Sequence, residues 1–175
     1  MGDVDGEDRR RSRERMRRTF LSVMVMVMAI ALFATAAIAA TFTCTGGPCE
    51  GTPNRDTITG SSSRDVITAK AGVDLVDALG GRDEVSLGRG GTPTDMEFVE
   101  GGAGNDELRG GRGGDELDDL QPSDIDDTDR LFGGRNDDSL FAEDGDGNDT
   151  LDGGPGVDDC FGDPGDRIVN CNNSR

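Results

Sequence analysis

The sequence predicts an all-β solenoid of short parallel strands over residues 51–161. The first observation is an aspartate followed two residues later by an aliphatic residue, a pair that recurs mostly at intervals of nine. The second is that glycines keep the same phase as these aspartates. The third is composition, since only 33% of the residues are apolar and Trp and Tyr are absent. A single large core of the usual kind is therefore not expected.

About eleven units follow this pattern, and the aliphatic residue of each is the inward-facing middle residue of a three-residue strand. The acidic and aliphatic pairs are Asp56/Ile58, Asp65/Ile67, Asp74/Val76, Asp83/Val85, Glu97/Val99, Asp106/Leu108, Asp115/Leu117, Asp129/Leu131, Asp138/Leu140, Asp149/Leu151 and Asp158/Cys160. Two intervals contain five extra residues. Because insertions in a solenoid fall in its turns, we expect bulged loops within 87–96 and 119–128, which contain Pro93 and Pro122.

The best-preserved units are GGAGNDELR (101–109), GGRGGDELD (110–118) and GGPGVDDCF (153–161), while GGRNDDSLF (133–141) and DGDGNDTLD (144–152) keep the same phase. Glycines at positions one, two and four permit backbone angles that are closed to other residues. Such a turn can aim its carbonyl oxygens at one point, and the aspartate at position six adds a carboxylate. Six to eight oxygen ligands suit Ca²⁺ better than Mg²⁺. The chain has no His, the common ligand of zinc and copper.

The candidate calcium ligands are therefore the glycines and aspartates of the better-preserved turns. They are Asp74, Asp83, Gly101, Gly102, Gly104, Asp106, Gly110, Gly111, Gly113, Asp115, Gly133, Gly134, Asp138, Asp144, Gly147, Asp149, Gly153, Gly154, Gly156 and Asp158. The alternative role of each aspartate is that of a turn former, which accepts hydrogen bonds from nearby backbone N–H groups. The turns at 51–56 and 60–65 lack the second and fourth glycines, so both an ion site and a purely structural turn stay open there.

The motif G-G-x-G-x-D-x-U-x in these units resembles the calcium-binding repeat of the RTX (repeats-in-toxin) family. The resemblance implies a parallel β-roll in which two nonapeptides make one turn and Ca²⁺ lies between turns stacked on the same side. Asp106 would then share ions with repeats two units away. Stacked carboxylates repel one another, so we expect folding to be coupled to calcium. The segments 44–60 and 153–171 also resemble small secreted calcium-binding repeat proteins of actinobacteria-like organisms.

The N-terminal segment has the order of a secretory signal peptide, which we expect to form a helix. Arginines precede an uncharged run from Phe20 to Ala37, and Ala37-Ile38-Ala39 matches an A-x-A cleavage site. The alternative is an uncleaved membrane anchor, because the run approaches spanning length. Arg17-Arg18 resembles a twin-arginine signal, but we favour the general secretory route because the cargo is expected to need calcium to fold. The predicted organisation is a signal over 1–39, caps over 40–50 and 162–175, and the repeat array over 51–161.

The four cysteines form two short pairs that flank the array: Cys44 with Cys49, and Cys160 with Cys171. An exported chain with an even number of cysteines suggests disulfides. Sequence alone permits three connectivities. We expect the local pairing, because a rigid roll would separate its two ends, and each disulfide would then close one end of the solenoid. Free thiols that bind a metal are the alternative.

Charge and composition narrow the function. Without residues 1–39, the chain has 31 acidic and 11 basic residues, so calcium ions are expected partners and nucleic acid is not. The absence of His excludes Ser-His-Asp and Cys-His catalysis, and we expect no enzyme. The predicted function is extracellular calcium binding, without membrane attachment once the signal is removed. The alternatives are calcium-dependent adhesion or self-association at the cell surface, and the repeat module of an extracellular enzyme.

Overall fold

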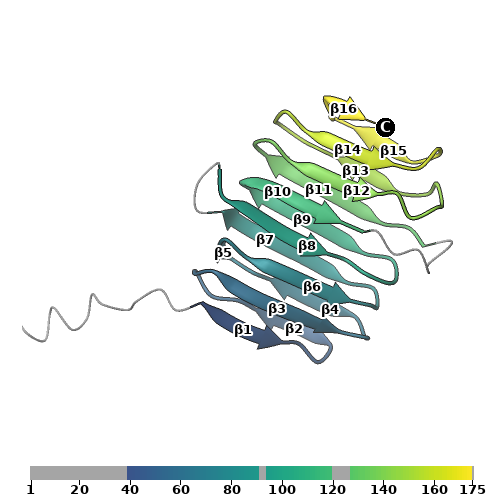
Figure 1. Ribbon diagram of the computed structural model, residues 1–175. Helices are drawn as coiled ribbons and strands as arrows, with labels where there is room; N and C mark the ends of the chain where they lie inside the picture. Colours follow the sequence, from purple (N-terminus) through teal and green to yellow (C-terminus); the bar gives the residue numbers. More distant parts are fainter. Residues whose placement is uncertain (1–38, 91–93, 120–126, 175) are drawn as a thin grey trace, which may run out of the picture. The chain divides into compact units, whose positions relative to one another are not determined.

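The computed structural model describes residues 39–90, 94–119 and 127–174, all of which belong to one compact unit. They form sixteen short strands in two parallel sheets (Figure 1). Within these ranges, the structure contains no apolar helix of membrane-spanning length. The predicted signal helix, together with Pro93 and Pro122 of the predicted loops, lies outside the described residues.

The strands of each sheet come from alternate positions along the chain. The first sheet consists of β1 (Ala40–Thr43), β3 (Asp56–Ser61), β6 (Leu75–Leu79), β8 (Met96–Glu100), β10 (Gly114–Asp118), β12 (Ser139–Ala142), β14 (Asp159–Gly162) and β16 (Asn173–Ser174). The second sheet consists of β2 (Gly47–Glu50), β4 (Asp65–Thr68), β5 (Ala71–Gly72), β7 (Glu84–Gly90), β9 (Glu107–Arg112), β11 (Arg130–Arg135), β13 (Thr150–Asp152) and β15 (Arg167–Val169).

The register follows the repeat. Val76 in β6 pairs with Ile58 in β3 and with Val99 in β8, so equivalent aliphatic residues of every second unit lie side by side. The intervening units do the same in the second sheet, where Leu108 pairs with Val85 and Leu131. Two units thus complete one turn of the solenoid. This all-β, two-sheet parallel arrangement confirms the predicted fold class, while the number of units stays a prediction.

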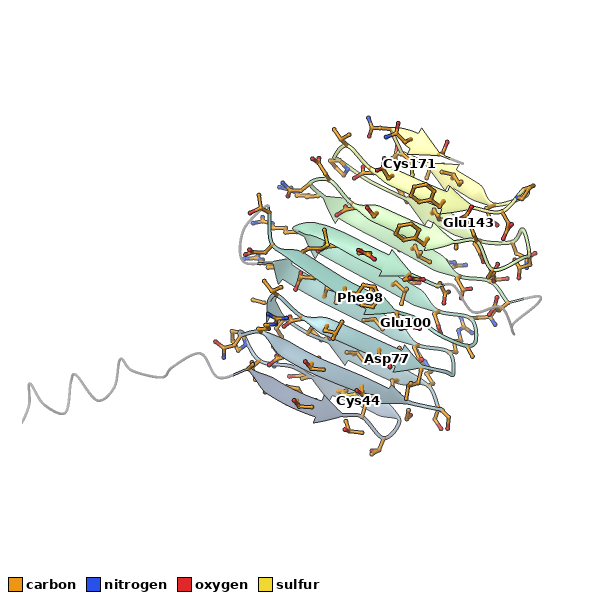
Figure 2. All side chains as sticks on the ribbon, viewed as in Figure 1. Cys44, Asp77, Phe98, Glu100, Glu143 and Cys171 are labelled. Atoms are coloured by element: carbon orange, nitrogen blue, oxygen red, sulfur yellow. A yellow bond between two sulfur atoms is a disulfide. The ribbon has the colours of Figure 1, made fainter. Side chains whose placement is uncertain are left out.

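The core is a narrow strip between the two sheets. The ten aliphatic residues predicted to face inward are all at most 1% exposed, and Cys160 fills the same slot at 0%. A second inward row lies two residues further along each strand and contains Ala69, Ala78, Leu87 and Ala142. On the outer face of the first sheet, Asp77 pairs in register with Glu100 (Figure 2). Because successive side chains of a strand alternate between its faces, the core is only one or two apolar residues deep per strand.

Two positions in the turns demand unusual backbone angles. Position two has a positive φ in the glycine-containing units, and Lys70 and Leu79 adopt it too, with φ of 89° and 71°. Gly104, at position four, has a φ of 120°, and a Cβ there would lie directly against the carbonyl oxygen of Gly81. The turns therefore stack so closely that the backbone of one unit fills the space of a side chain in the next, which explains the glycines of the repeat.

Both ends of the array carry a disulfide between neighbouring segments (Figure 2). Cys44 is joined to Cys49 with a Cα–Cα distance of 5.8 Å, and Cys160 is joined to Cys171 at 6.0 Å. These are the local pairs expected from the sequence. Strands β1 and β2 at one end, and β15 and β16 at the other, pair into the same two sheets, so the segments 40–50 and 162–174 continue the solenoid.

Candidate metal centre

The position-six residues form two rows, one at the N-terminal ends of the strands of each sheet, which Figure 1 shows as arrows. The first row lies at or just before the start of strands of the first sheet and consists of Asp56, Asp74, Glu97, Asp115, Asp138 and Asp158. The second row lies at or just before the start of strands of the second sheet and consists of Asp65, Asp83, Asp106, Asp129, Asp149 and Asp166. Every member is buried except Asp166, which is half-buried. Two lines of acidic groups thus run along the solenoid, just inside its turns.

One oxygen of most of these carboxylates holds the rows together. The Oδ1 atom accepts a hydrogen bond from the backbone N–H of the acidic residue two units earlier. Asp106 Oδ1 lies 2.6 Å from the nitrogen of Asp83, and Asp129 Oδ1 lies 2.6 Å from that of Asp106. In the first row, Asp138 Oδ1 lies 2.8 Å from the nitrogen of Asp115. The position-six side chain therefore has a structural role in every turn where this bond forms, but its partner lies in another unit and not in the same turn, as a local turn former would have it.

The second oxygen has no such role in most units. The Oδ2 atoms of Asp74, Asp83, Asp106, Asp138, Asp149 and Asp158 are buried and accept no hydrogen bond from the described residues. Both carboxylate oxygens of Glu97 and of Asp115 are likewise buried and accept no hydrogen bond from the described residues. Buried polar atoms in proteins almost always have partners, and an isolated buried charge is especially costly. These oxygens therefore call for a proton, a cation or an ordered water as a partner.

The first two units differ from the others. Asp56 Oδ2 accepts hydrogen bonds from the backbone nitrogen of Thr52 at 2.6 Å and from its hydroxyl at 3.0 Å. Asp65 Oδ2 accepts the equivalent bonds from Ser61, at 2.8 and 2.9 Å. Thr52 and Ser61 stand at position two, where the complete repeats have glycine. In these two turns, a hydroxyl group of the chain donates to Oδ2 the hydrogen bond that the other turns lack.

Additional carboxylates gather along the second row. Oxygen atoms of Asp106, Asp119 and Asp129 lie within 4.8 Å of one another. The next two gaps of the row each hold a further acidic residue, Asp144 between Asp129 and Asp149, and Asp146 between Asp149 and Asp166. A fourth group consists of Asp127, Asp144 and Asp146. The described part of the first row has no such third carboxylate within this distance. The two rows therefore offer a cation different numbers of negative charges.

The structure divides the sequence-predicted residues between the two rows. The turns of the first row contain Asp74, Gly110, Gly111, Gly113, Asp115, Gly133, Gly134, Asp138, Gly153, Gly154, Gly156 and Asp158. The turns of the second row contain Asp83, Gly101, Gly102, Gly104, Asp106, Asp144, Gly147 and Asp149. The rows bring together residues 17 to 23 positions apart in the sequence. Asp106 lies between Asp83 and Asp129, as the sharing between units two apart requires.

Sequence reasoning missed several acidic members of these clusters as ligand candidates. Asp119 and Asp129 flank the longer turn, where the nine-residue phase and the glycines are lost. Asp166 comes eight residues after Asp158, but it is followed by Ile168 in the familiar spacing, and Ile168 pairs with Leu151. The pair Asp166/Ile168 was the sequence signal that could have extended the predicted repeat array beyond residue 161.

Burial raises the pKa of the row carboxylates from Asp74 to Asp166 above the usual range of aspartate and glutamate. The pKa is about 8 for Glu97, Asp106 and Asp138, about 7 for Asp149 and about 6 for Asp115. Neighbouring carboxylates raise it further at each of these groups except Asp115. Without a cation, the rows therefore hold protons near neutral pH.

The fold and the two rows define a class: solenoids whose turns present buried oxygen ligands to hard cations. The family model of the RTX calcium-binding nonapeptide repeat matches the chain in four copies, over residues 50–85, 95–118, 125–146 and 142–169. Since these matches cover more than half of the sequence, the chain belongs to the RTX calcium-binding repeat family. No curated protein and no solved structure matches the chain.

The raised pKa values predict that acid stabilises the metal-free protein. An unfolded aspartate titrates near pH 4. Between about pH 4 and 8 the folded chain then binds more protons than the unfolded chain, so the free energy of unfolding falls as the pH rises. Once metal is removed by chelation, far-UV circular dichroism should show more strand signal at pH 4.5 than at pH 8. A strand signal that increases with pH in metal-free protein would contradict this account of the rows.

Proposed function

We propose that the protein is a secreted, non-catalytic calcium-binding module whose folding is coupled to the ion. The observation that carries the proposal is the set of buried Oδ2 atoms that accept no hydrogen bond, repeated from turn to turn along both rows. A cation between successive members of a row would compensate these oxygens. The family's calcium-binding repeats support Ca²⁺ as that cation.

The chemistry of the turns favours Ca²⁺ over other metals. The side chains in the rows offer oxygen only, and the four cysteines are held in disulfides. Zinc and copper sites in proteins use imidazole or thiolate ligands. Mg²⁺ keeps several waters and requires near-octahedral geometry, while Ca²⁺ accepts six to eight oxygens in flexible arrangements. Two carboxylates from units in succession, with backbone carbonyls of the glycine turns, would make such a set.

Coupling to folding follows from the same atoms. The apolar strip contributes little burial per unit, and the ladder of backbone hydrogen bonds must form against repulsion within each row. An ion that binds only the folded chain stabilises it in proportion to the logarithm of its concentration relative to Kd. The free energy of calcium binding therefore contributes directly to the free energy of folding.

The first two turns are proposed to hold no ion. Thr52 and Ser61 already donate hydrogen bonds to Asp56 and Asp65. These carboxylates therefore gain less from a cation than those whose Oδ2 accepts no hydrogen bond. Together with the disulfide between Cys44 and Cys49, they would form an end of the roll that is ordered without calcium. The remaining candidates, from Asp74 to Asp158, are proposed as the ligands.

The organisation of the chain is proposed as a signal peptide over 1–39, disulfide-closed ends over 40–50 and 162–175, and the repeat array over 51–161. Two disulfides support an oxidising, extracellular location. The absence of His from the chain and the family's ion-binding repeats support a non-catalytic role.

Calcium should order the protein. At near-neutral pH we expect calcium to raise the strand signal in far-UV circular dichroism well above that of the metal-free protein, in which only the N-terminal end stays ordered, and EDTA to reverse the gain. At a calcium concentration about 100-fold above Kd, each site should add about 2.7 kcal/mol to the free energy of unfolding. Magnesium at equal concentration is the control and should act far more weakly. A strand signal that EDTA does not change would count against the coupling of folding to calcium. A calorimetric titration with no heat of calcium binding would count against calcium binding itself.

Two charge-matched variants should separate ligands from turn formers. Asp138→Asn should lower the calcium stoichiometry by about one or two ions, because Asp138 lies between two neighbours of its row and loses its anionic Oδ2. Asp56→Asn should leave the stoichiometry unchanged, because Thr52 already donates to its carboxylate. Equilibrium dialysis measures both. Equal losses in the two variants would refute the distinction.

The proposed cleavage after Ala39 fixes the mass of the exported protein. Mass spectrometry of protein collected from the culture medium should give a chain that begins at Ala40 and contains two disulfides. A chain that retains residues 1–39 in the membrane fraction would instead identify the apolar run as an anchor.

A further inference from the structure

The fourth residue after each position-six acid, called here the turn-entry residue, faces the core, and one unit breaks the pattern. At the turns of the second row this residue is buried and is Gly60, Ala78, Gly101, Asp119, Ala142 or Gly162. In the first row the equivalent residues are glycine, alanine or leucine. Asp119 is the only charged side chain at this position among the described residues. An apolar residue suits the fold there, so the carboxylate needs another explanation.

The surroundings of Asp119 give its side chain no donor. It is 3% exposed, and neither of its carboxylate oxygens accepts a hydrogen bond from the described residues. Its backbone keeps the ordinary ladder, since its N–H donates to the carbonyl of Phe141 at 2.9 Å. The side chain is aimed at the second row, where its oxygen, one from Asp106 and one from Asp129 lie within 4.8 Å of one another. Three buried acids converge on one point.

We propose that Asp119, Asp106 and Asp129 form a three-carboxylate calcium site that binds its ion more tightly than the two-carboxylate sites of the regular repeats. The inference rests on the proposed calcium binding and adds a ligand that the nonapeptide does not encode. Asp106 and Asp129 are the position-six residues that the repeat supplies. Asp119 is the turn-entry residue four positions after Asp115, at the start of the longer turn.

Charge count is the reason for tighter binding. Calcium affinity in proteins is tuned by the number of charged ligands and by the rigidity of the site. Asp119 adds a third negative charge in a buried setting, where attraction to a cation is screened less than at the surface. The groups around Asp144 and Asp146 are less closed: both side chains are half-buried, and a carboxylate oxygen of Asp144 already accepts the N–H of Asp146 at 3.2 Å. The Asp119 site is therefore expected to bind calcium the most tightly of the four groups.

Calcium titration of the full chain by isothermal calorimetry tests the proposal through Asp119→Asn. The neighbouring Asp118→Asn is the matched control, because it removes the same charge one residue away, from the half-buried outer side of β10. The wild-type chain should show one step tighter than the rest. Asp119→Asn should weaken that step by about tenfold or more, and Asp118→Asn should leave it in place.

A second variant guards against a folding defect. Asp119→Ala gives the turn-entry position the residue that the fold already accommodates at Ala78 and Ala142, so its strand signal in saturating calcium should equal that of the wild type. It should lose the tight step as Asp119→Asn does. If both variants keep the tight step, the three-carboxylate site is wrong while calcium binding stands. If the wild-type chain itself takes up no calcium, the proposed function fails first.

Discussion

The structure depends on keeping anionic oxygens buried in stacked rows. Seven position-six aspartates, from Asp74 to Asp158, use Oδ1 to accept the backbone N–H of the acidic residue two units earlier, a bond of 2.6 to 2.9 Å. This bond aligns successive turns, and so it also brings like charges into line. The interaction that sets the register of the solenoid thus creates the electrostatic demand that a cation meets, and structure and ion binding cannot be separated.

The demand is not uniform along the chain. At the N-terminal end, hydroxyls of Thr52 and Ser61 satisfy the carboxylates, and the Cys44–Cys49 disulfide restrains the entry of the chain. At the C-terminal end, Asp166 has both oxygens bonded to backbone N–H groups, and the Cys160–Cys171 disulfide lies beside it in the sequence. The buried Oδ2 atoms that accept no hydrogen bond lie between these two ends. A solenoid whose ends are satisfied internally offers its middle turns a fixed template on each side.

Sequence periodicity predicted the fold to the extent that the period held. The spacing of Asp106 and Leu108 predicted a buried aliphatic residue after each turn, and the structure buries all ten. The role of Thr52 could not be predicted, because a missing glycine does not show that a hydroxyl reaches Asp56 Oδ2. Asp119 was missed for a different reason. It converges with Asp106 and Asp129 only through the stacking of turns, and the longer interval hides that register.

The interruptions of the repeat also explain how the two rows came to differ. A residue at position six takes part in the ladder, so its replacement changes both the register and the ligands. Extra residues in a turn leave the strands untouched, since closing a longer loop adds little entropic cost. The longer turns of the second row bring Asp119, Asp144 and Asp146 next to the row, whereas the longer turn of the first row ends in Glu97, with both carboxylate oxygens buried and without a donor. Insertions are therefore the places where this solenoid can vary its ion sites without altering its ladder.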